Sequence, residues 1–229
     1  MDATVKNKPV THRKGYAVEI NALWYNAICF AIEIAKKLKE TDFLKKWEHL
    51  PAITQQAFIN KFWVSNGNYL ADFCTTQQQD TSVRPNQIIA AALPFSPLND
   101  NQKVDVINCV KHKLLTKKGL RTLSPADSRY KPYFLGSHED RERAYHQGTV
   151  HPWLLEFYAK SIVSVYKKDA LPELNKMFFN FEEDMLQAAI GTINEVYDGD
   201  PPHEPRGAIS QAWSIAALLQ VKMLMDKLI

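Results

Sequence analysis

The sequence predicts a single all-α domain over residues 1–229, and three observations support this prediction. Apolar residues recur at helical spacing along most of the chain. Almost no segment alternates apolar and polar residues as a half-buried strand does. The apolar content of 45% is ordinary for a globular protein and allows a sizeable core.

Seven helices account for the periodic segments. The first carries apolar residues on most of its sides, so we expect it to be largely buried. The pattern of the second extends backwards through Leu44 and Trp47. The third has Pro85 in its first turn, and the fourth is capped by Asp100 and followed by Gly119, which suits the position after a helix. The expected helices cover Val18–Leu38, Gln55–Trp63, Pro85–Leu93, Val104–Leu115, His151–Tyr166, Leu174–Ile193 and Ile209–Ile229.

Two long irregular stretches, 64–86 and 117–147, interrupt these helices. Loops of this length in a compact domain are usually functional or disordered. Polar motifs lie close to helix ends, so helix pairs arranged in a ring would bring alternate loops to one face. Such a cup could hydrogen-bond sugar hydroxyls while aromatic rings stack on the apolar sugar faces. The candidate rings are Trp24, Tyr25, Trp63, Tyr69, Tyr145, Trp153 and Trp213.

The segment Glu195–His203 is the strongest local signal of a site. It combines carboxylates, an aromatic ring and a histidine with a stiff Pro-Pro pair, between two apolar helical runs. A helix connection needs only a few polar residues, and polar loops on helical supports often carry function. A well-capped loop without further function is an equally good interpretation of this segment alone.

Composition limits the partners that we expect. The net charge is +3 with acids and bases interspersed, which indicates neither a nucleic-acid nor a membrane partner. No apolar run approaches the roughly 20 residues of a membrane span, and the N-terminus lacks a signal-peptide pattern. Three cysteines without CxxC spacing favour a reducing, cytoplasmic location. The histidines His146, His151 and His203 lack metal-site spacing, so we expect no metal or other cofactor.

Five motifs, in order along nearly the whole chain, resemble the C-terminal glucosidase domain family of glycogen debranching enzyme. A run of five long motifs is far more specific than one short pattern. They are Gly15–Ala27, Ser82–Gln87, Gly119–Pro125, Tyr145–Val150 and Glu195–Gly199, the last continuing to Gln211–Trp213.

The resemblance implies a six-hairpin (α/α)6 toroid that hydrolyses α-1,6-linked glucose at branch points of glycogen or another α-glucan, with inversion. One carboxylic acid protonates the leaving oxygen and a second carboxylate, about 6.5–9.5 Å away, activates water. Glu195 matches the family's base, and Asp2 resembles its acid. The chain departs from the family in having seven expected helices instead of twelve, and His151 in place of a tryptophan. It therefore resembles the C-terminal portion of the toroid.

The resemblance also implies a set of substrate-binding residues, each of which has an ordinary structural alternative. Asp80 and Arg84 could form a loop ion pair, and Arg121 could stabilise a helix C-terminus. Glu19 could serve as an alternative acid, and Trp24 could belong to the core. The implied set is Glu19, Asn21, Trp24, Asp80, Arg84, Asn86, Gln87, Arg121, His146, Gln147, Asp198 and His203.

Two functions remain open at this point. The chain is either a hydrolase of the amylo-α-1,6-glucosidase type or a catalytically incomplete α-glucan-binding fragment or subunit. An incomplete toroid would expose the apolar flank of its inner helices, and large apolar patches usually mark interfaces. We therefore expect a homo-oligomer, and we expect the loops that hold Glu19, Arg84, Arg121, His146 and Glu195 to share one face.

Overall fold

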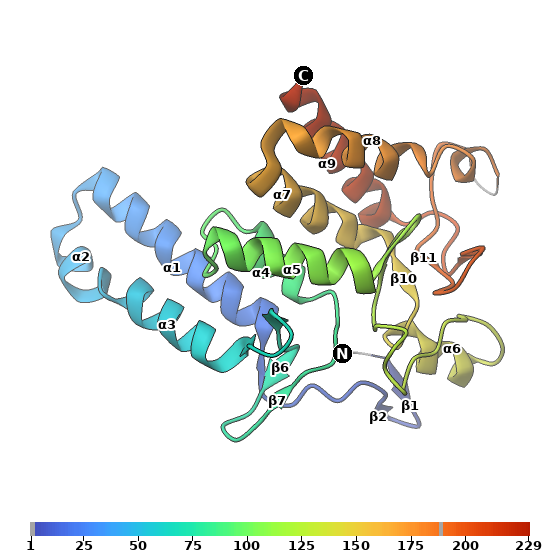
Figure 1. Ribbon diagram of the computed structural model, residues 1–229, viewed down its shortest axis with the longest axis horizontal. Coiled ribbons are helices and arrows are strands. Elements are labelled where there is room, and N and C mark those ends of the chain that lie inside the picture. The colour runs from blue at the N-terminus through green and yellow to red at the C-terminus, as the bar shows by residue number, and fades with distance from the viewer. Residues whose placement is uncertain (1–2, 188–189) are drawn as a thin grey trace.

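The computed structural model describes residues 3–187 and 190–229, in which helices dominate and short strands join them (Figure 1). The helices are α1 Val18–Leu38, α2 Thr41–Trp47, α3 Leu50–Phe62, α4 Gln87–Ala92, α5 Asp100–Lys113, α6 His138–Tyr145, α7 Leu155–Tyr166, α8 Leu171–Phe179 and α9 Ala212–Leu228. Three 3₁₀ turns cover Pro152–Leu154, Lys167–Ala170 and Asp184–Leu186.

Short strands, which the periodicity did not predict, connect the helices. They are β1 Thr4–Val5, β2 Lys8–Pro9, β3 Tyr16–Ala17, β4 Trp63–Val64, β5 Tyr69–Leu70, β6 Phe73–Cys74, β7 Gln79–Asp80, β8 Leu115–Thr116, β9 Gly119–Arg121, β10 Val150–His151, β11 Val196–Tyr197 and β12 Pro205–Arg206. Strands of two or three residues are too short to show a period of two, which is why sequence patterning misses them.

The largest of these sheets has the order β12-β11-β10-β9-β8, with each pair antiparallel. It joins the segments after α5, α6 and the loop around Glu195. Gly119 was predicted to follow a helix, which is wrong because α5 ends at Lys113 and Gly119 lies in β9. Its φ of +140° and its approach to His151 explain the glycine, because a Cβ would lie 2.6 Å from the His151 carbonyl oxygen.

Most predicted helices are present, with different ends. The predicted bounds of α1 are confirmed. The second predicted helix, Gln55–Trp63, corresponds to the latter part of α3, and its backward extension through Leu44 and Trp47 forms the separate helix α2. Asn99, not Asp100, caps α5 through a capping box with Gln102. Helix α6 lies in a stretch that was expected to be irregular, where Ser137 and Asp140 form a second capping box.

The predicted helix Leu174–Ile193 is wrong over its second half. Helix α8 ends at Phe179, and the chain turns so that Phe181 becomes fully buried with its ring 6.0 Å from that of Tyr197. Lys118 reinforces this turn by donating to the Asn180 carbonyl oxygen and pairing with Asp184. These contacts with distant segments override the helical pattern of the sequence.

The core lies where α4 packs on α7, with α1 and α5 alongside and α9 behind α7 (Figure 1). Helix α4 is buried on nearly all sides, including Ile88, Ile89, Ala90 and Ala91. Because this short helix is apolar throughout, it can occupy the centre of the molecule. The motif Ser82–Gln87 immediately precedes it and is thereby fixed to the core.

Helix α1 is not largely buried, contrary to the sequence prediction. Its inner face, with Ala22 and Ile28, is covered by α3 and α4, whereas its outer face carries exposed apolar side chains. By length and composition alone α1 could also cross a membrane, which differs from the expectation that no apolar run is long enough. The core helix of a soluble protein passes the same test. The exposed apolar residues of α1 are Ile20, Leu23, Trp24, Phe30, Ile34 and Leu38, and those of α9 are Trp213, Leu219 and Met223.

Candidate functional site

A cleft of about 380 Å³ lies where the first turn of α1, the segment before α4, the end of α6 and the start of α7 meet. One carboxylate, one guanidinium, one amide, one hydroxyl, one phenol, two imidazoles and two indoles face it, together with three apolar side chains. Its lining residues are Arg13, Glu19, Pro85, Asn86, Ile89, Thr122, Tyr145, His146, His151, Trp153, Leu154 and Trp213. This mixture of hydrogen-bonding groups and flat rings suits a polyhydroxylated ligand.

Glu195 is tied to the wall of this cleft by Tyr145. The Tyr145 hydroxyl donates to Glu195 Oε1 over 2.7 Å, and the Ala208 amide donates to Oε2 over 2.9 Å. Glu195 directly precedes β11, whose pairing with β10 holds this segment in place. The carboxylate is half-buried, and each oxygen keeps a further lone pair for a water or hydroxyl.

The glycine at position 207 makes room for this carboxylate. Its φ is +69°, and a Cβ there would lie 2.6 Å from Glu195 Oε2. The backbone therefore approaches Glu195 more closely than any other residue type would permit.

Imidazole and phenol rings form a compact group in the lining of the cleft. The rings of His146 and His151 stack with centroids 6.0 Å apart, and Tyr145 meets both edge-on. A ring nitrogen of His151, Nε2, lies 3.0 Å from the Tyr145 carbonyl oxygen. In residues 3–187 and 190–229 no group of three or more His, Cys, Asp and Glu side chains is placed to hold a metal ion.

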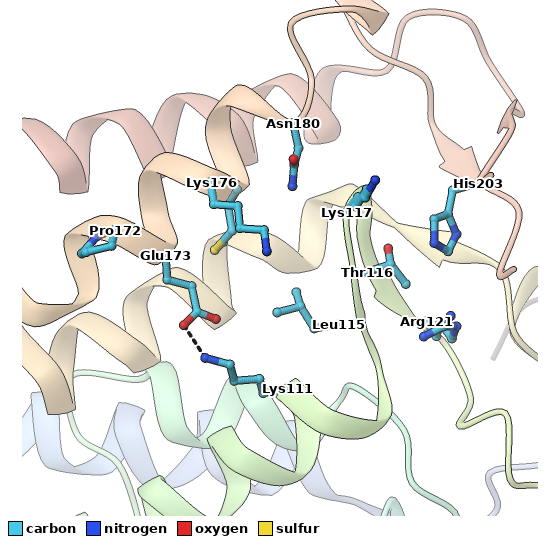
Figure 2. A pocket seen from close by; sticks show the side chains of 11 residues that line it. Lys111, Leu115, Thr116, Lys117, Arg121, Pro172, Glu173, Lys176, Asn180 and His203 are labelled. Atoms are coloured by element: carbon cyan, nitrogen blue, oxygen red, sulfur yellow. Dashed lines mark hydrogen bonds and ion pairs between the residues drawn. The ribbon is translucent and has the colours of Figure 1, made fainter. Parts of the chain in front are cut away.

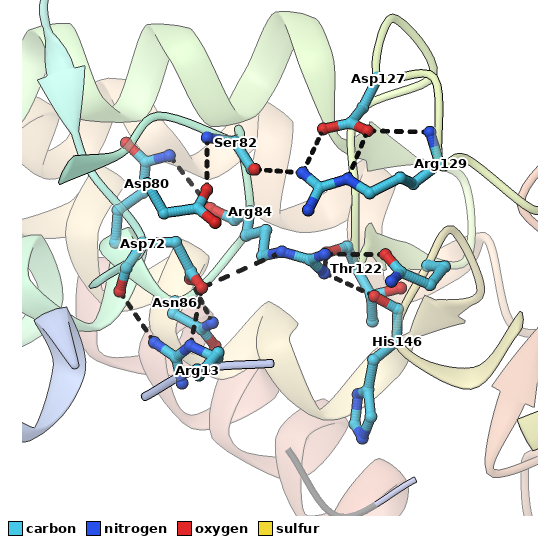
Figure 3. A network of polar contacts seen from close by, with 12 residues as sticks. Arg13, Asp72, Asp80, Ser82, Arg84, Asn86, Thr122, Asp127, Arg129 and His146 are labelled. Carbon is cyan, nitrogen blue, oxygen red and sulfur yellow. Dashed lines mark hydrogen bonds and ion pairs between the residues drawn. The ribbon is translucent and has the colours of Figure 1, made fainter. Parts of the chain in front are cut away.

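A buried ionic network underlies the opposite wall (Figure 3). Arg13 forms a bidentate pair with Glu19 at 2.6 and 2.7 Å, and its Nε lies 2.7 Å from Asp72 Oδ2, a contact too poorly aligned for a hydrogen bond. Asp72 Oδ1 accepts from Asn86 over 2.7 Å. Burial raises the pKa of Asp72, and Arg13, Asn86 and Arg84 oppose this shift. The network sets the positions of Glu19 and Asn86, two residues that face the cleft.

Arg84 extends the network towards His146. Its guanidinium donates to the Thr122 carbonyl oxygen at 3.1 Å, to Gln147 Oε1 at 2.7 Å and to the His146 carbonyl oxygen at 2.5 Å (Figure 3). Burial lowers the pKa of Arg84, an effect that the carboxylate of Asp72 opposes. Arg84 thus joins three segments that are far apart in the sequence, and positions the backbone that carries His146.

Comparison with known proteins shows the family of the chain. A family model described as amylo-alpha-1,6-glucosidase matches residues 1–220. The chain belongs to this family. The glycogen debranching enzyme of Saccharomyces cerevisiae is 25% identical over 190 residues, which cover 67% of this chain and 12% of the yeast protein.

Solved structures agree on the fold of this amylo-alpha-1,6-glucosidase family member. Neutral trehalase from Saccharomyces cerevisiae superposes with a TM-score of 0.68 at 14% identity, covering 91% of this chain and 38% of the trehalase. The GH63 mannosylglycerate hydrolase from Thermus thermophilus, in complex with glucose, superposes with a TM-score of 0.63 at 14% identity, covering 90% of this chain and 47% of the hydrolase. The fold is therefore that of the six-hairpin glycosidases, and the chain spans less than half the length of these relatives.

The site residues expected from the family motifs divide into three groups. Glu19, Asn86 and His146 line the cleft, and Glu195 adjoins it through Tyr145. Asp2 lies outside the described residues. Arg84, Gln87 and Gln147 are buried and hold backbone in place, since Gln87 accepts from the Leu70 amide and donates to the Arg84 carbonyl oxygen. These three do not line the cleft, and the substrate-binding role expected for them stays a prediction.

Three further predicted residues lie away from the cleft. Asn21 donates to the Ala17 carbonyl oxygen and faces a separate hollow beside α3. Asp80 accepts from the Ser82 amide and orders that loop. Trp24 is 57% exposed and lines an apolar groove with α2, so the core interpretation of this residue is wrong. Helical spacing could not show which side of α1 is covered.

The last three predicted residues also do not line the cleft. Asp198 pairs with Arg206 at 2.8 Å and accepts from the Phe134 amide, so it holds its own loop. Arg121 and His203 line a different cavity, described below (Figure 2). The segments that hold Glu19, Arg84, Arg121, His146 and Glu195 meet at the cleft, as expected, although the Arg121 side chain faces the other cavity. Arg121 is the last residue of β9, and successive side chains of an extended segment point to opposite sides, so Thr122 directly after it faces the cleft instead.

Sequence reasoning missed Arg13 and Asp72, the two residues that anchor Glu19 and Asn86. Arg13 precedes the Gly15–Ala27 motif, and Asp72 lies in a stretch that was expected to be irregular. The only available signal was an acid between the apolar residues Leu70 and Phe73, where an isolated charge would be costly without a buried partner.

Proposed function

We propose that this chain hydrolyses α-1,6-linked glucose at branch points of glycogen or a similar α-glucan, by an inverting mechanism. The observation that carries the proposal is the cleft with Glu195 held at its wall by Tyr145, in a chain of this glycosidase family. The yeast relative, a glycogen debranching enzyme by name, supports the choice of substrate.

In this proposal Glu195 is the general base. Its two oxygens are oriented by the donors Tyr145 and Ala208, and a remaining lone pair takes the proton of the attacking water. Inversion needs a second carboxyl group on the opposite side of the sugar, separated by about 6.5–9.5 Å. The family resemblance assigns this acid to Asp2.

Glu19 has a different role from the acid. Both of its oxygens already accept hydrogen bonds from Arg13, so a proton on Glu19 would displace one of them. With Asn86 and His146, its free lone pairs are placed to bind glucose hydroxyls. Trp153 and the half-exposed Trp213 provide flat faces for the apolar sides of the sugar.

A second function, α-glucan binding without hydrolysis, is favoured by the exposed apolar faces of α1 and α9. A partner chain or further helices would cover such apolar faces. In this second function the site is complete only when that partner is bound. The two functions differ in a single measurement, the release of glucose.

The test is glucose release from a phosphorylase limit dextrin, with glucan binding measured in parallel. We expect Glu195→Gln to lower kcat by about 10²–10⁴-fold and to leave binding intact, because an amide cannot accept the proton of water. Glu204→Gln is the matched control, because Glu204 is an exposed carboxylate in the same loop. This variant should leave both kcat and glucan binding unchanged. Full activity of Glu195→Gln would refute the base assignment. Binding without any glucose release by the unmodified chain would favour the second function.

A further inference from the structure

A second cavity, of about 560 Å³, lies between α5, α8, the β8–β9 hairpin and the loop after β11 (Figure 2). None of the residues that line it also lines the glucan cleft. Four cationic side chains and one carboxylate face it. The lining residues with charge are Lys111, Lys117, Arg121, Lys176 and Glu173.

The positive charge of this cavity is mostly uncompensated. Glu173 pairs with Lys111 at 2.6 Å and also accepts from the Tyr158 hydroxyl. Within residues 3–187 and 190–229, Lys117, Lys176 and Arg121 make no ion pair with any carboxylate. Arg121 Nε donates to the Gly199 carbonyl oxygen at 2.8 Å, which orients the guanidinium without neutralising it.

His203 lies beside these cations and is held neutral. Burial lowers its pKa, and the charges of Arg121 and Lys117 lower it further, against the opposing effects of the hydrogen bond to the Asp198 carbonyl and of the charge of Asp200. Its Nδ1 lies 2.9 Å from the Asp198 carbonyl oxygen, so Nδ1 carries the proton. The neutral ring therefore leaves Nε2 as an acceptor for a ligand hydroxyl.

The other walls of the cavity narrow the choice of ligand. The Asn180 amide offers hydrogen bonds, while Leu115, Pro172 and Met177 form an apolar surface. The Thr116 hydroxyl donates to the Gly119 carbonyl oxygen and accepts from the Lys118 amide, so it keeps one lone pair to accept from a ligand hydroxyl. Among the described residues, the imidazole of His203 is the only aromatic ring that lines the cavity, so it has little on which a nucleotide base could stack. A volume of this size accommodates a small ligand bearing one anionic group.

We propose that this cavity binds a phosphate monoester of a hexose, either free or carried on a glucan chain. Lys117, Lys176 and Arg121 would hold the phosphate through charge-assisted hydrogen bonds. The hydroxyls of the sugar would meet His203, Thr116 and Asn180. The site is separate from the cleft, so it does not depend on the proposed hydrolysis.

Calorimetric titration of the full chain with glucose 6-phosphate tests this site. We expect Lys117→Gln/Lys176→Gln to weaken binding about tenfold and to reduce its salt dependence, because two phosphate contacts are lost. The matched control is Lys36→Gln/Lys46→Gln, which removes two exposed charges on α1 and α2 and should leave the affinity unchanged. Unaltered unfolding temperatures of both double variants establish that the fold is intact.

Competing ligands identify the chemistry. Glucose should bind far more weakly than glucose 6-phosphate, and inorganic phosphate and AMP more weakly as well. A phosphorylated α-glucan, compared with the same glucan after phosphatase treatment, shows whether the ester is recognised on the polymer, and the free ester shows whether it is recognised alone. Equal or tighter binding of inorganic phosphate or AMP would overturn the sugar-phosphate assignment. Absence of binding by both esters, or the same affinity in Lys117→Gln/Lys176→Gln, would overturn the site.

Discussion

Replacing Asp72 by asparagine tests whether the buried ionic network supports the cleft. The Asp72 side chain is 1% exposed, and its carboxylate lies between the guanidiniums of Arg13 and Arg84, at 2.7 and 4.0 Å. Asp72→Asn keeps the shape but removes the charge, so two arginines that are almost fully buried lose a counter-ion. Breaking a buried pair in this way costs about 3–5 kcal/mol, a large part of a stability of about 5–15 kcal/mol.

Urea unfolding at neutral pH measures this loss. A protein of this size loses roughly 2–4 °C in Tm for each kcal/mol, so thermal unfolding should shift by roughly 6–20 °C. Asp42→Asn is the matched control, because Asp42 pairs with Lys45 at 3.5 Å and its side chain is 97% exposed. An isolated pair in solvent contributes little, so this variant should unfold like the unmodified chain.

The same variant should weaken glucan binding at temperatures where it is still folded. Asn86 would lose its acceptor at Asp72 Oδ1, and Arg13 would hold Glu19 less firmly. If the free energy of unfolding of Asp72→Asn lies within about 1 kcal/mol of that of the unmodified chain, the network contributes little to stability, and the reasoning from the burial and geometry of these ion pairs is wrong.

Three further predictions concern Glu195, His203 and the exposed helices. Gly207→Ala should lower kcat for glucose release by about 10–100-fold by displacing Glu195, whereas Gly191→Ala, also at positive φ but with no atom within 4 Å, should cost only stability. His203 has a lowered pKa, so the stability that it contributes is present above about pH 6.5 and is lost as the pH falls below this value. Asparagine tolerates the φ of 65° at this position, so His203→Asn should keep the backbone unchanged. Between about pH 7.5 and about pH 5, the free energy of unfolding from urea titrations should therefore fall less for His203→Asn than for the unmodified chain. The apolar outer faces of α1 and α9 should drive self-association, and a strictly monomeric species of 26.2 kDa by light scattering would contradict this.

Local signals in the sequence were sufficient for the helices and for part of the site. The bounds of α1 follow from its periodicity, and the Glu195 segment follows from its unusual density of polar groups. Both depend on residues that are close together in the chain. The end of α8 could not be predicted, because it depends on contacts of Phe181 and Asp184 with Tyr197 and Lys118.

The pairings that build the site depend on the tertiary structure. Arg13 contacts Asp72, which is 59 positions away in the sequence, and Arg84 contacts Gln147, which is 63 positions away. Contacts between residues so far apart produce no periodic pattern in the sequence. Arg121, at the end of β9, faces one cavity, and Thr122, directly after it, faces the other. A strand of three residues is too short to show this alternation in the sequence. Periodicity and composition therefore predict the helical class and show which residues are available for chemistry. Only the folded chain decided which of them meet, because charges come together through the packing of helices that are distant in sequence.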